Sequence, residues 1–186
     1  MNMRIIGGIY RSRLISMPKN ADIRPTQDKV RQAIFNMLGD MEGSRVLELF
    51  AGSGAIGIEA ISRGAGHATF VDNDRSCTDT IRANLGSLGI RECSYDIIRG
   101  NALETVARLS GGGMLFNIIF LDPPYHKDLA RNCLIRLDEC DILAPGGLVI
   151  VEHFKKDPLT ADLCGLIIEK EKRYGDIIVS IYRKTA

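Results

Sequence analysis

The chain has 186 residues, of which 45% are hydrophobic and 25% are charged, and its formal net charge at pH 7 is +1. This length and composition favour one globular domain with a sizeable core, and no apolar run approaches the roughly 18 residues that a membrane span needs. The N-terminus lacks the apolar stretch of a signal peptide, and the five cysteines include no CxxC pair. We therefore expect a cytoplasmic protein without a disulfide framework or a metal site.

The first 31 residues hold seven basic and two acidic side chains, a net charge of +5, and the rest of the chain carries −4. Residues 4–9 and 13–17 predict a small β-hairpin with its turn at 10–12, and Thr26 predicts the N-cap of a helix that runs to Leu38. A basic segment on a near-neutral body is typical of a phosphate-binding surface, with a solvated face as the ordinary alternative. The candidate nucleic-acid contacts are Arg4, Tyr10, Arg11, Arg13 and Arg24.

Strands and helices alternate along the rest of the chain. Predicted strands cover 45–50, 67–72, 95–99, 117–121 and 147–152, and predicted helices cover 58–63, 75–88, 102–109 and 129–137. A turn is expected at 144–147, and segments 166–173 and 176–182 predict a closing antiparallel hairpin. We therefore expect an α/β, Rossmann-like fold with a doubly wound, mostly parallel sheet. One domain, 1–186, would consist of a basic extension, 1–39, and a core, 40–186.

A glycine-rich turn follows the first predicted strand of this core. Gly52, Gly54 and Gly57 let the backbone turn tightly and approach a ligand at the point where a strand gives way to a helix. Asp72 ends the next strand, 20 residues after Gly52. An acidic residue at this spacing is typical of a contact to a ribose hydroxyl pair. The pattern predicts a site for a nucleoside-containing cofactor.

The same glycine spacing is formally the dinucleotide fingerprint, so a nicotinamide-dependent oxidoreductase is an alternative. Glu48 lies within the strand just before the loop and would repel a pyrophosphate placed beside it. A carboxylate there suits a cationic ligand. S-adenosylmethionine, which has an amino group and a sulfonium and no phosphate, fits this requirement.

The segment Asp122-Pro123-Pro124-Tyr125 directly follows the apolar run 118–121, where a buried strand is expected to end. In open α/β sheets, ligands bind at such strand ends. An exocyclic base amine could donate its hydrogens to the Asp122 side chain and to the Pro123 carbonyl, whose direction the proline ring helps to fix. Tyr125 could stack on the base. The alternative for these four residues is an ordinary strand-to-loop exit.

Taken together, these motifs resemble those of a known family. Segment 48–54 with Asp72 and 122–125 resembles class I S-adenosylmethionine-dependent methyltransferases that modify exocyclic base amines. The N-terminal segments 4–13 and 24–36 are similar to the RsmD family, which methylates N2 of a guanine in small-subunit ribosomal RNA. The resemblance ends near His153.

The resemblance implies a set of site residues and partners. Asp122, Pro123 and Tyr125 would be catalytic, and the N-terminal candidates would contact ribosomal RNA. The RNA would be part of a small-subunit particle, and the enzyme would be a monomer. The implied cofactor-binding residues are Glu48, Phe50, Gly52, Gly54, Asp72, Asn101, Ala102 and Asp122. Two of them depart from the family pattern, because Asp72 stands where Glu is usual and Asn101 stands where Asp is usual. Asp72 keeps the charge with a shorter reach, and Asn101 can still hydrogen-bond an adenine through its amide.

Other functions stay open at the level of the sequence. The acceptor could be a different exocyclic amine, such as adenine N6 of DNA or RNA. The chain could also be an oxidoreductase that uses a nicotinamide cofactor, or a module that binds RNA without catalysis.

Overall fold

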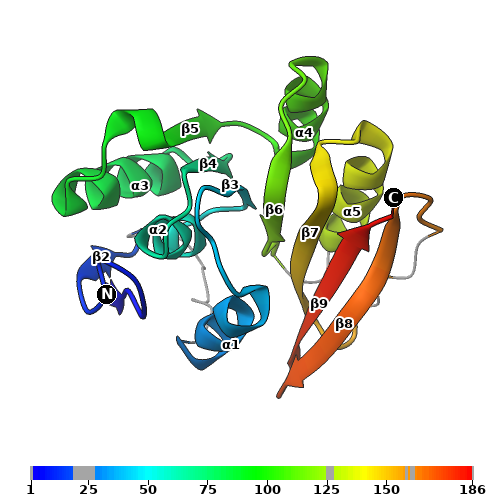
Figure 1. Ribbon diagram of the computed structural model, residues 1–186, viewed down its shortest axis with the longest axis horizontal. Helices are drawn as coiled ribbons and strands as arrows, with labels where there is room; N and C mark the ends of the chain where they lie inside the picture. The colour runs from blue at the N-terminus through cyan, green and yellow to red at the C-terminus, as the bar shows by residue number, and fades with distance from the viewer. Residues whose placement is uncertain (1, 19–27, 125–127, 158, 160–161, 186) are drawn as a thin grey trace. The chain divides into compact units, whose positions relative to one another are not determined.

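The computed structural model describes residues 2–18, 28–124, 128–157, 159 and 162–185. Contacts within the chain divide it into two compact units, residues 1–100 and 101–186. Figure 1 labels the helices and strands of both. Thr26, Arg24 and Tyr125, which the sequence singles out, lie outside the described residues. None of the helices in the described ranges is long and apolar enough to cross a membrane.

The first unit contains parallel strands with helices between them. Its elements are β1 (Asn2–Arg4), β2 (Leu14–Ser16), α1 (Asp28–Leu38), β3 (Arg45–Leu49), α2 (Ala55–Ser62), β4 (His67–Asp72), α3 (Arg75–Leu88), a 3₁₀ turn (Glu92–Ser94) and β5 (Tyr95–Arg99). Strand β4 pairs in parallel with β3 on one side and with β5 on the other. Helix α2 is buried along nearly its whole length, as its apolar sequence requires.

The second unit combines a parallel strand pair with an antiparallel hairpin. Its elements are α4 (Ala102–Gly111), β6 (Phe116–Leu121), α5 (Leu129–Cys140), β7 (Leu143–Phe154), β8 (Leu166–Tyr174) and β9 (Ile177–Lys184). Strands β6 and β7 are parallel, whereas β9 pairs antiparallel with both β7 and β8. The α/β class, the mostly parallel pairing and the closing hairpin are thus confirmed. The prediction of a single domain stays a prediction.

The turn predicted at 144–147 is wrong in its position. These residues lie inside β7, where the pairing with β6 shifts register: Leu143 pairs with Phe116, and the next pair joins Leu148 to Ile118. Gly146 has a φ of 70°, which supplies the left-handed backbone of this irregularity. The proline and glycines therefore produce a bulge in a longer strand instead of a turn before it.

The N-terminal hairpin exists, but its strands are shorter than predicted. The first, Asn2–Arg4, lies nearer to the chain end than predicted, and the second, Leu14–Ser16, lies inside the predicted range 13–17. Within the described residues of this segment, the strand pairing joins Asn2–Arg4 to Leu14–Ser16, and residues 5–13 form the connection between them. The reason is that the backbone of this connection bonds to α2. The N–H groups of Ile6 and Gly7 donate to the Glu59 carboxylate at 2.8 and 2.7 Å, and that of Ile9 donates to the Ser62 carbonyl at 2.7 Å.

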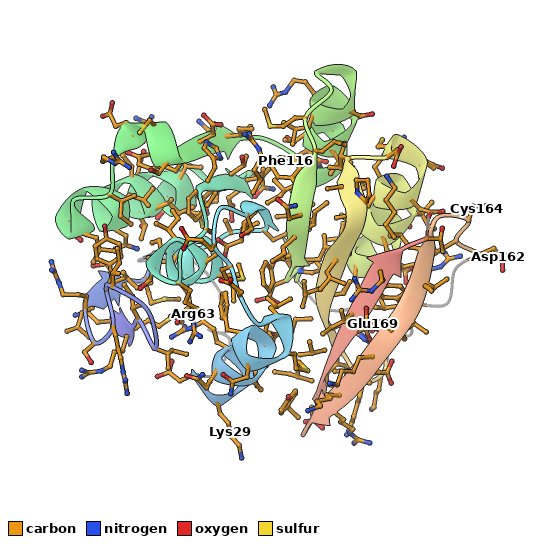
Figure 2. The ribbon with its side chains drawn as sticks, viewed as in Figure 1. Lys29, Arg63, Phe116, Asp162, Cys164 and Glu169 are labelled. Carbon is orange, nitrogen blue, oxygen red and sulfur yellow. The ribbon has the colours of Figure 1, made fainter. Side chains whose placement is uncertain are left out.

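Two arginines balance the buried Glu59 carboxylate. Arg63 Nε lies 2.7 Å from Glu59 Oε1, and its guanidinium stacks over the Phe35 ring of α1 at 4.9 Å, so it lies between α2 and α1 (Figure 2). Arg31 of α1 is 1% exposed, and its Nε lies 3.9 Å from Glu59 Oε2. It also pairs with Asp28 at 3.1 Å and donates to the Arg4 carbonyl. Arg31 therefore belongs to the interior, although it contributes to the basic charge counted from the sequence.

Gly8 permits the close approach of the hairpin to α2. Its φ is 73°, and a Cβ added there would lie 1.7 Å from the Ser62 carbonyl oxygen. Gly39 has the same φ of 73° with nothing within 4 Å of an added Cβ.

We expect Gly39→Ala to cost about 1 kcal/mol of unfolding free energy, the penalty for the backbone alone, and Gly8→Ala to cost clearly more. Urea unfolding of both variants measures the difference, and equal losses would show that the hairpin does not need this contact.

Candidate cofactor and substrate site

The turn between β3 and α2 has three residues with left-handed backbone. Phe50, Gly52 and Gly54 have φ values of 60°, 54° and 75°. Glycine adopts this conformation at no steric cost, whereas for Phe50 it costs roughly 1–2 kcal/mol. Backbone strain of this kind is concentrated at functional sites. The glycine spacing predicted the turn, but nothing in the sequence indicated the strained Phe50.

Asp72 connects the end of β4 to this turn. Its Oδ2 accepts the Gly52 N–H at 2.8 Å, and its Oδ1 accepts the Asp74 N–H at 2.9 Å. Asp74 in turn begins α3, because its side chain accepts the Ser76 N–H at 2.7 Å. The acidic residue predicted to meet a ribose thus also fixes the glycine turn and the start of the following helix.

The carboxylate of Asp72 has the capacity to bind a diol as well. It is half-buried, and a carboxylate offers about four acceptor directions: two take the backbone N–H groups, and a third faces the Cys77 thiol, a weak donor that a ribose hydroxyl can displace. Gly52, whose N–H it holds, is the first glycine of the turn. The acceptor oxygens of Asp72 therefore fit the ribose of a nucleoside cofactor, with the backbone of the glycine turn beside it.

Glu48 has a structural role that the sequence did not reveal. Its carboxylate is buried and accepts the N–H groups of Ile56 and Gly57 at 3.3 and 2.8 Å, in the first turn of α2. Burial raises the pKa of Glu48 to about 8, and the two backbone N–H groups oppose that shift. The side chain thus satisfies N–H groups that the helix itself leaves unbonded. Direct contact with the cationic end of a cofactor stays a prediction.

In the second unit, Asp122 follows β6 directly. Leu121 at the end of β6 pairs with Val151, so Asp122 leaves the sheet beside the part of β7 that continues toward Glu152. Asp122 is half-buried, Pro123 is buried and Pro124 is exposed. The predicted position of the Asp-Pro-Pro segment at the end of a buried parallel strand is confirmed, while Tyr125 lies outside the described residues.

Asn101 and Ala102 open helix α4. Asn101 is its N-cap, because the side-chain oxygen accepts the N–H groups of Leu103 and Glu104 at 2.9 and 3.3 Å, and Ala102 is buried. The swap of the usual Asp for Asn preserves a good N-cap. An adenine contact through the amide nitrogen stays a prediction.

His153, which has no role in the sequence-based predictions, is part of the interior of the second unit. Its Nε2 lies 2.9 Å from Ser180 Oγ and its Nδ1 lies 3.0 Å from the Asp157 carbonyl oxygen. Both ring nitrogens therefore have partners, which indicates a structural role.

The basic N-terminal candidates lie on the hairpin of the first unit. Arg4, Arg11 and Arg13 are exposed and Tyr10 is half-buried. Arg13 donates to the Ser87 carbonyl at the end of α3 at 3.2 Å. Ile9, which the sequence did not single out, is 80% exposed beside Tyr10. The hairpin therefore presents cations together with an apolar side chain.

Comparison with known proteins gives close relatives along the whole chain. The family model described as conserved hypothetical protein 95 matches residues 3–183. The putative rRNA methyltransferase YlbH of Bacillus subtilis is 37% identical over 185 residues, which cover 98% of this chain and 99% of the relative. The ribosomal RNA small subunit methyltransferase D of Escherichia coli is 32% identical over 185 residues, which cover 99% of this chain and 91% of the relative.

Solved structures agree with these sequence matches. The putative methyltransferase yhhF from Escherichia coli has a TM-score of 0.88 at 30% identity, covering 100% of this chain and 99% of that chain. The putative methylase HI0767 from Haemophilus influenzae has a TM-score of 0.82 at 28% identity and covers 100% of both chains. The chain is thus similar to methyltransferases in sequence and in fold.

The raised pKa of Glu48 predicts a pH-dependent stability. In the unfolded chain this carboxyl ionises near 4.5, whereas in the folded chain it keeps its proton up to about pH 8. Its contribution to the unfolding free energy is therefore fully present below pH 4.5 and is lost as the pH rises through 8. Glu48→Gln keeps one acceptor oxygen, loses one hydrogen bond and cannot ionise.

The melting temperatures of the wild type and Glu48→Gln, measured from pH 4.5 to 8.5, isolate this effect. We expect the variant to gain on the wild type by several °C as the pH rises, since about 1 kcal/mol corresponds to roughly 2–4 °C in a chain of this size. A constant difference across the range would show that Glu48 does not titrate in this way.

Proposed function

We propose a function for this chain on the premise of its family: the chain belongs to the family described as conserved hypothetical protein 95, and it is an S-adenosylmethionine-dependent methyltransferase of ribosomal RNA. Relatives that match nearly its full length bear the names of rRNA methyltransferases. The finer proposal is that the acceptor is the N2 amine of a guanine in small-subunit rRNA. The methyltransferase D of Escherichia coli, named for the small subunit, supports that choice.

The observation that carries this function is the carboxylate-braced turn at the end of β3. Asp72 holds Gly52 through its Oδ2 and keeps acceptor capacity for a ribose, and the strained Phe50 lies two residues before Gly52. These features support a nucleoside-containing cofactor, and the rRNA methyltransferase relatives support S-adenosylmethionine over a dinucleotide.

S-adenosylmethionine, when bound, supplies an electrophilic methyl group on a sulfonium. Asp72, Phe50, Gly52 and Gly54 would hold its nucleoside portion. In the second unit, the Asp122 carboxylate would accept one hydrogen of the guanine amine, and the Pro123 carbonyl would accept the other. These two bonds orient the nitrogen lone pair, and orientation of the reactants supplies most of the rate. The amine proton becomes acidic only as the nitrogen is alkylated, so Asp122 acts first as an acceptor.

Mass spectrometry of rRNA nucleosides tests the acceptor. The purified chain is incubated with S-adenosylmethionine and small subunits from a strain that lacks this protein, and in parallel with the deproteinised rRNA. We expect N2-methylguanosine, and a higher yield from whichever substrate presents the target. N6-methyladenosine would identify a different amine, and the absence of any methylated nucleoside from both substrates would contradict the function.

The same assay tests the role of Asp122. Asp122→Ala should lower methyl transfer roughly 100-fold or more, the effect of misplacing a reactant, while affinity for S-adenosylhomocysteine changes by only a few fold. Asp122→Asn still accepts a hydrogen bond, so residual activity there would favour orientation over a need for charge. Turnover like that of the wild type in Asp122→Ala would refute the proposed mechanism.

The cofactor site is tested by calorimetry with S-adenosylhomocysteine. Asp72→Ala should weaken binding by roughly 1.5–3 kcal/mol, the range for hydrogen bonds to a charged group. The matched control is Asp74→Ala, which removes the cap of α3 and should lower stability by about 1 kcal/mol with little change in affinity. Unchanged affinity in a folded Asp72→Ala variant would remove Asp72 from the site.

The RNA surface is tested through salt dependence. Each phosphate contact on a single strand contributes about −0.7 to the slope of log affinity against log salt. The double variant Arg11→Ala/Arg13→Ala should lose one to two of these contacts, so the slope should become shallower by about 0.7–1.4. Its affinity for S-adenosylhomocysteine should not change. Arg82→Ala/Arg91→Ala removes the same charge from other exposed positions of the first unit. Equal effects of the two pairs would show that the hairpin makes no specific contact.

A further inference from the structure

Asn84 lies near the C-terminal end of α3 and is only 3% exposed. Its side-chain oxygen accepts the Ser16 N–H at 2.8 Å, and its amide nitrogen donates to the Ser16 carbonyl at 3.0 Å. The same nitrogen donates to the Ser53 carbonyl, also at 3.0 Å. One buried side chain therefore bonds to strand β2 of the hairpin and to the turn between Gly52 and Gly54.

The chemistry of these bonds requires a carboxamide. The pair of bonds with Ser16 imitates the exchange between neighbouring β-strands, because one donor and one acceptor lie side by side. The second N–H of the amide then serves Ser53. An aspartate has no N–H to donate, and an apolar residue would leave the Ser16 and Ser53 groups unbonded in a buried place, at a cost that folded proteins generally avoid. Asparagine is also a poor residue for a helix interior, so propensity does not explain it.

Helix α3 connects the same two regions at both of its ends. At the start, Asp74 donates its N–H to the Asp72 carboxylate that braces Gly52. At the end, the Ser87 carbonyl accepts from Arg13 of the hairpin. Asn84 lies between these contacts and is the point where the glycine turn and the hairpin bond to one side chain. The glycine turn is thus linked to β2 through two hydrogen-bonded steps.

We propose that Asn84 is a positioning residue that couples the cofactor turn to the N-terminal hairpin, so that occupancy of the nucleoside site orders the hairpin for RNA. This inference rests on the proposed function, since it assigns the turn to the cofactor and the hairpin to RNA. Coupling between two sites is reciprocal, so RNA on the hairpin strengthens cofactor binding by the same factor. The consequence is cooperative binding: the cofactor-loaded enzyme takes up RNA more tightly than the free enzyme does, and the RNA-bound enzyme takes up the cofactor more tightly.

Hydrogen–deuterium exchange of the full chain, with and without saturating S-adenosylhomocysteine, tests this coupling. We expect slower exchange in two regions, the turn 49–57 and the hairpin 2–17, with at least about a fivefold change in the hairpin, the lower end of typical coupling. No binding, or no change in the turn, would be a failure of the proposed function. Protection of the turn with an unchanged hairpin would overturn the proposed coupling and leave the proposed function intact. The wild-type chain is sufficient for this comparison.

Two substitutions in α3 assign the effect to Asn84. Asn84→Asp keeps the acceptor for the Ser16 N–H but places an oxygen against the Ser16 and Ser53 carbonyls. Its hairpin should lose the response to S-adenosylhomocysteine while the turn keeps its own. Thr80→Ala removes the Thr80 to Ser76 bond of the same helix and should respond like the wild type. A hairpin response retained in Asn84→Asp, or lost equally in Thr80→Ala, would overturn the assignment to Asn84.

Discussion

The first unit depends on one constraint: the backbone N–H groups at its strand-to-helix turns need acceptors, and carboxylates supply them. Glu48 accepts two N–H groups at the start of α2, and Asp72 accepts those of Gly52 and Asp74. The turn between β3 and α2 is therefore held from both sides. This bracing explains how the left-handed Phe50 persists, because a strained residue needs surroundings that overdetermine its conformation.

The same solution fastens the hairpin to the unit. Glu59 accepts two N–H groups from the segment after β1, and Arg63 and Arg31 compensate its buried charge. Breaking such a pair by removing one partner is strongly destabilising, because it leaves an uncompensated charge in the interior. The hairpin that carries the exposed arginines is thus bonded to α2 at one place and to Asn84 of α3 at another.

For several elements, the bounds predicted from the sequence agree with the structure at both ends. β4, α3 and β5 have the predicted bounds, because apolar periodicity, the Asp74 cap and the Gly89 stop define them locally. The hairpin strands could not be placed, since Gly7 and Ile9 bond to a helix more than 50 residues away. In the sequence, Glu48 is only an electrostatic signal, because its contact with α2 depends on a tertiary arrangement. Asn84 had no motif to mark it, although a buried asparagine within a helix is itself a signal.

The central claim is that Asp72 and the glycine turn form a nucleoside site. A crystal structure of the chain with S-adenosylhomocysteine tests it most directly. The account predicts the two ribose hydroxyls on the Asp72 carboxylate, with the Gly52 N–H still bonded to Asp72 Oδ2 and the Asn84 bonds to Ser16 and Ser53 intact. A ligand bound elsewhere on the chain, or a ribose that makes no contact with Asp72, would contradict it.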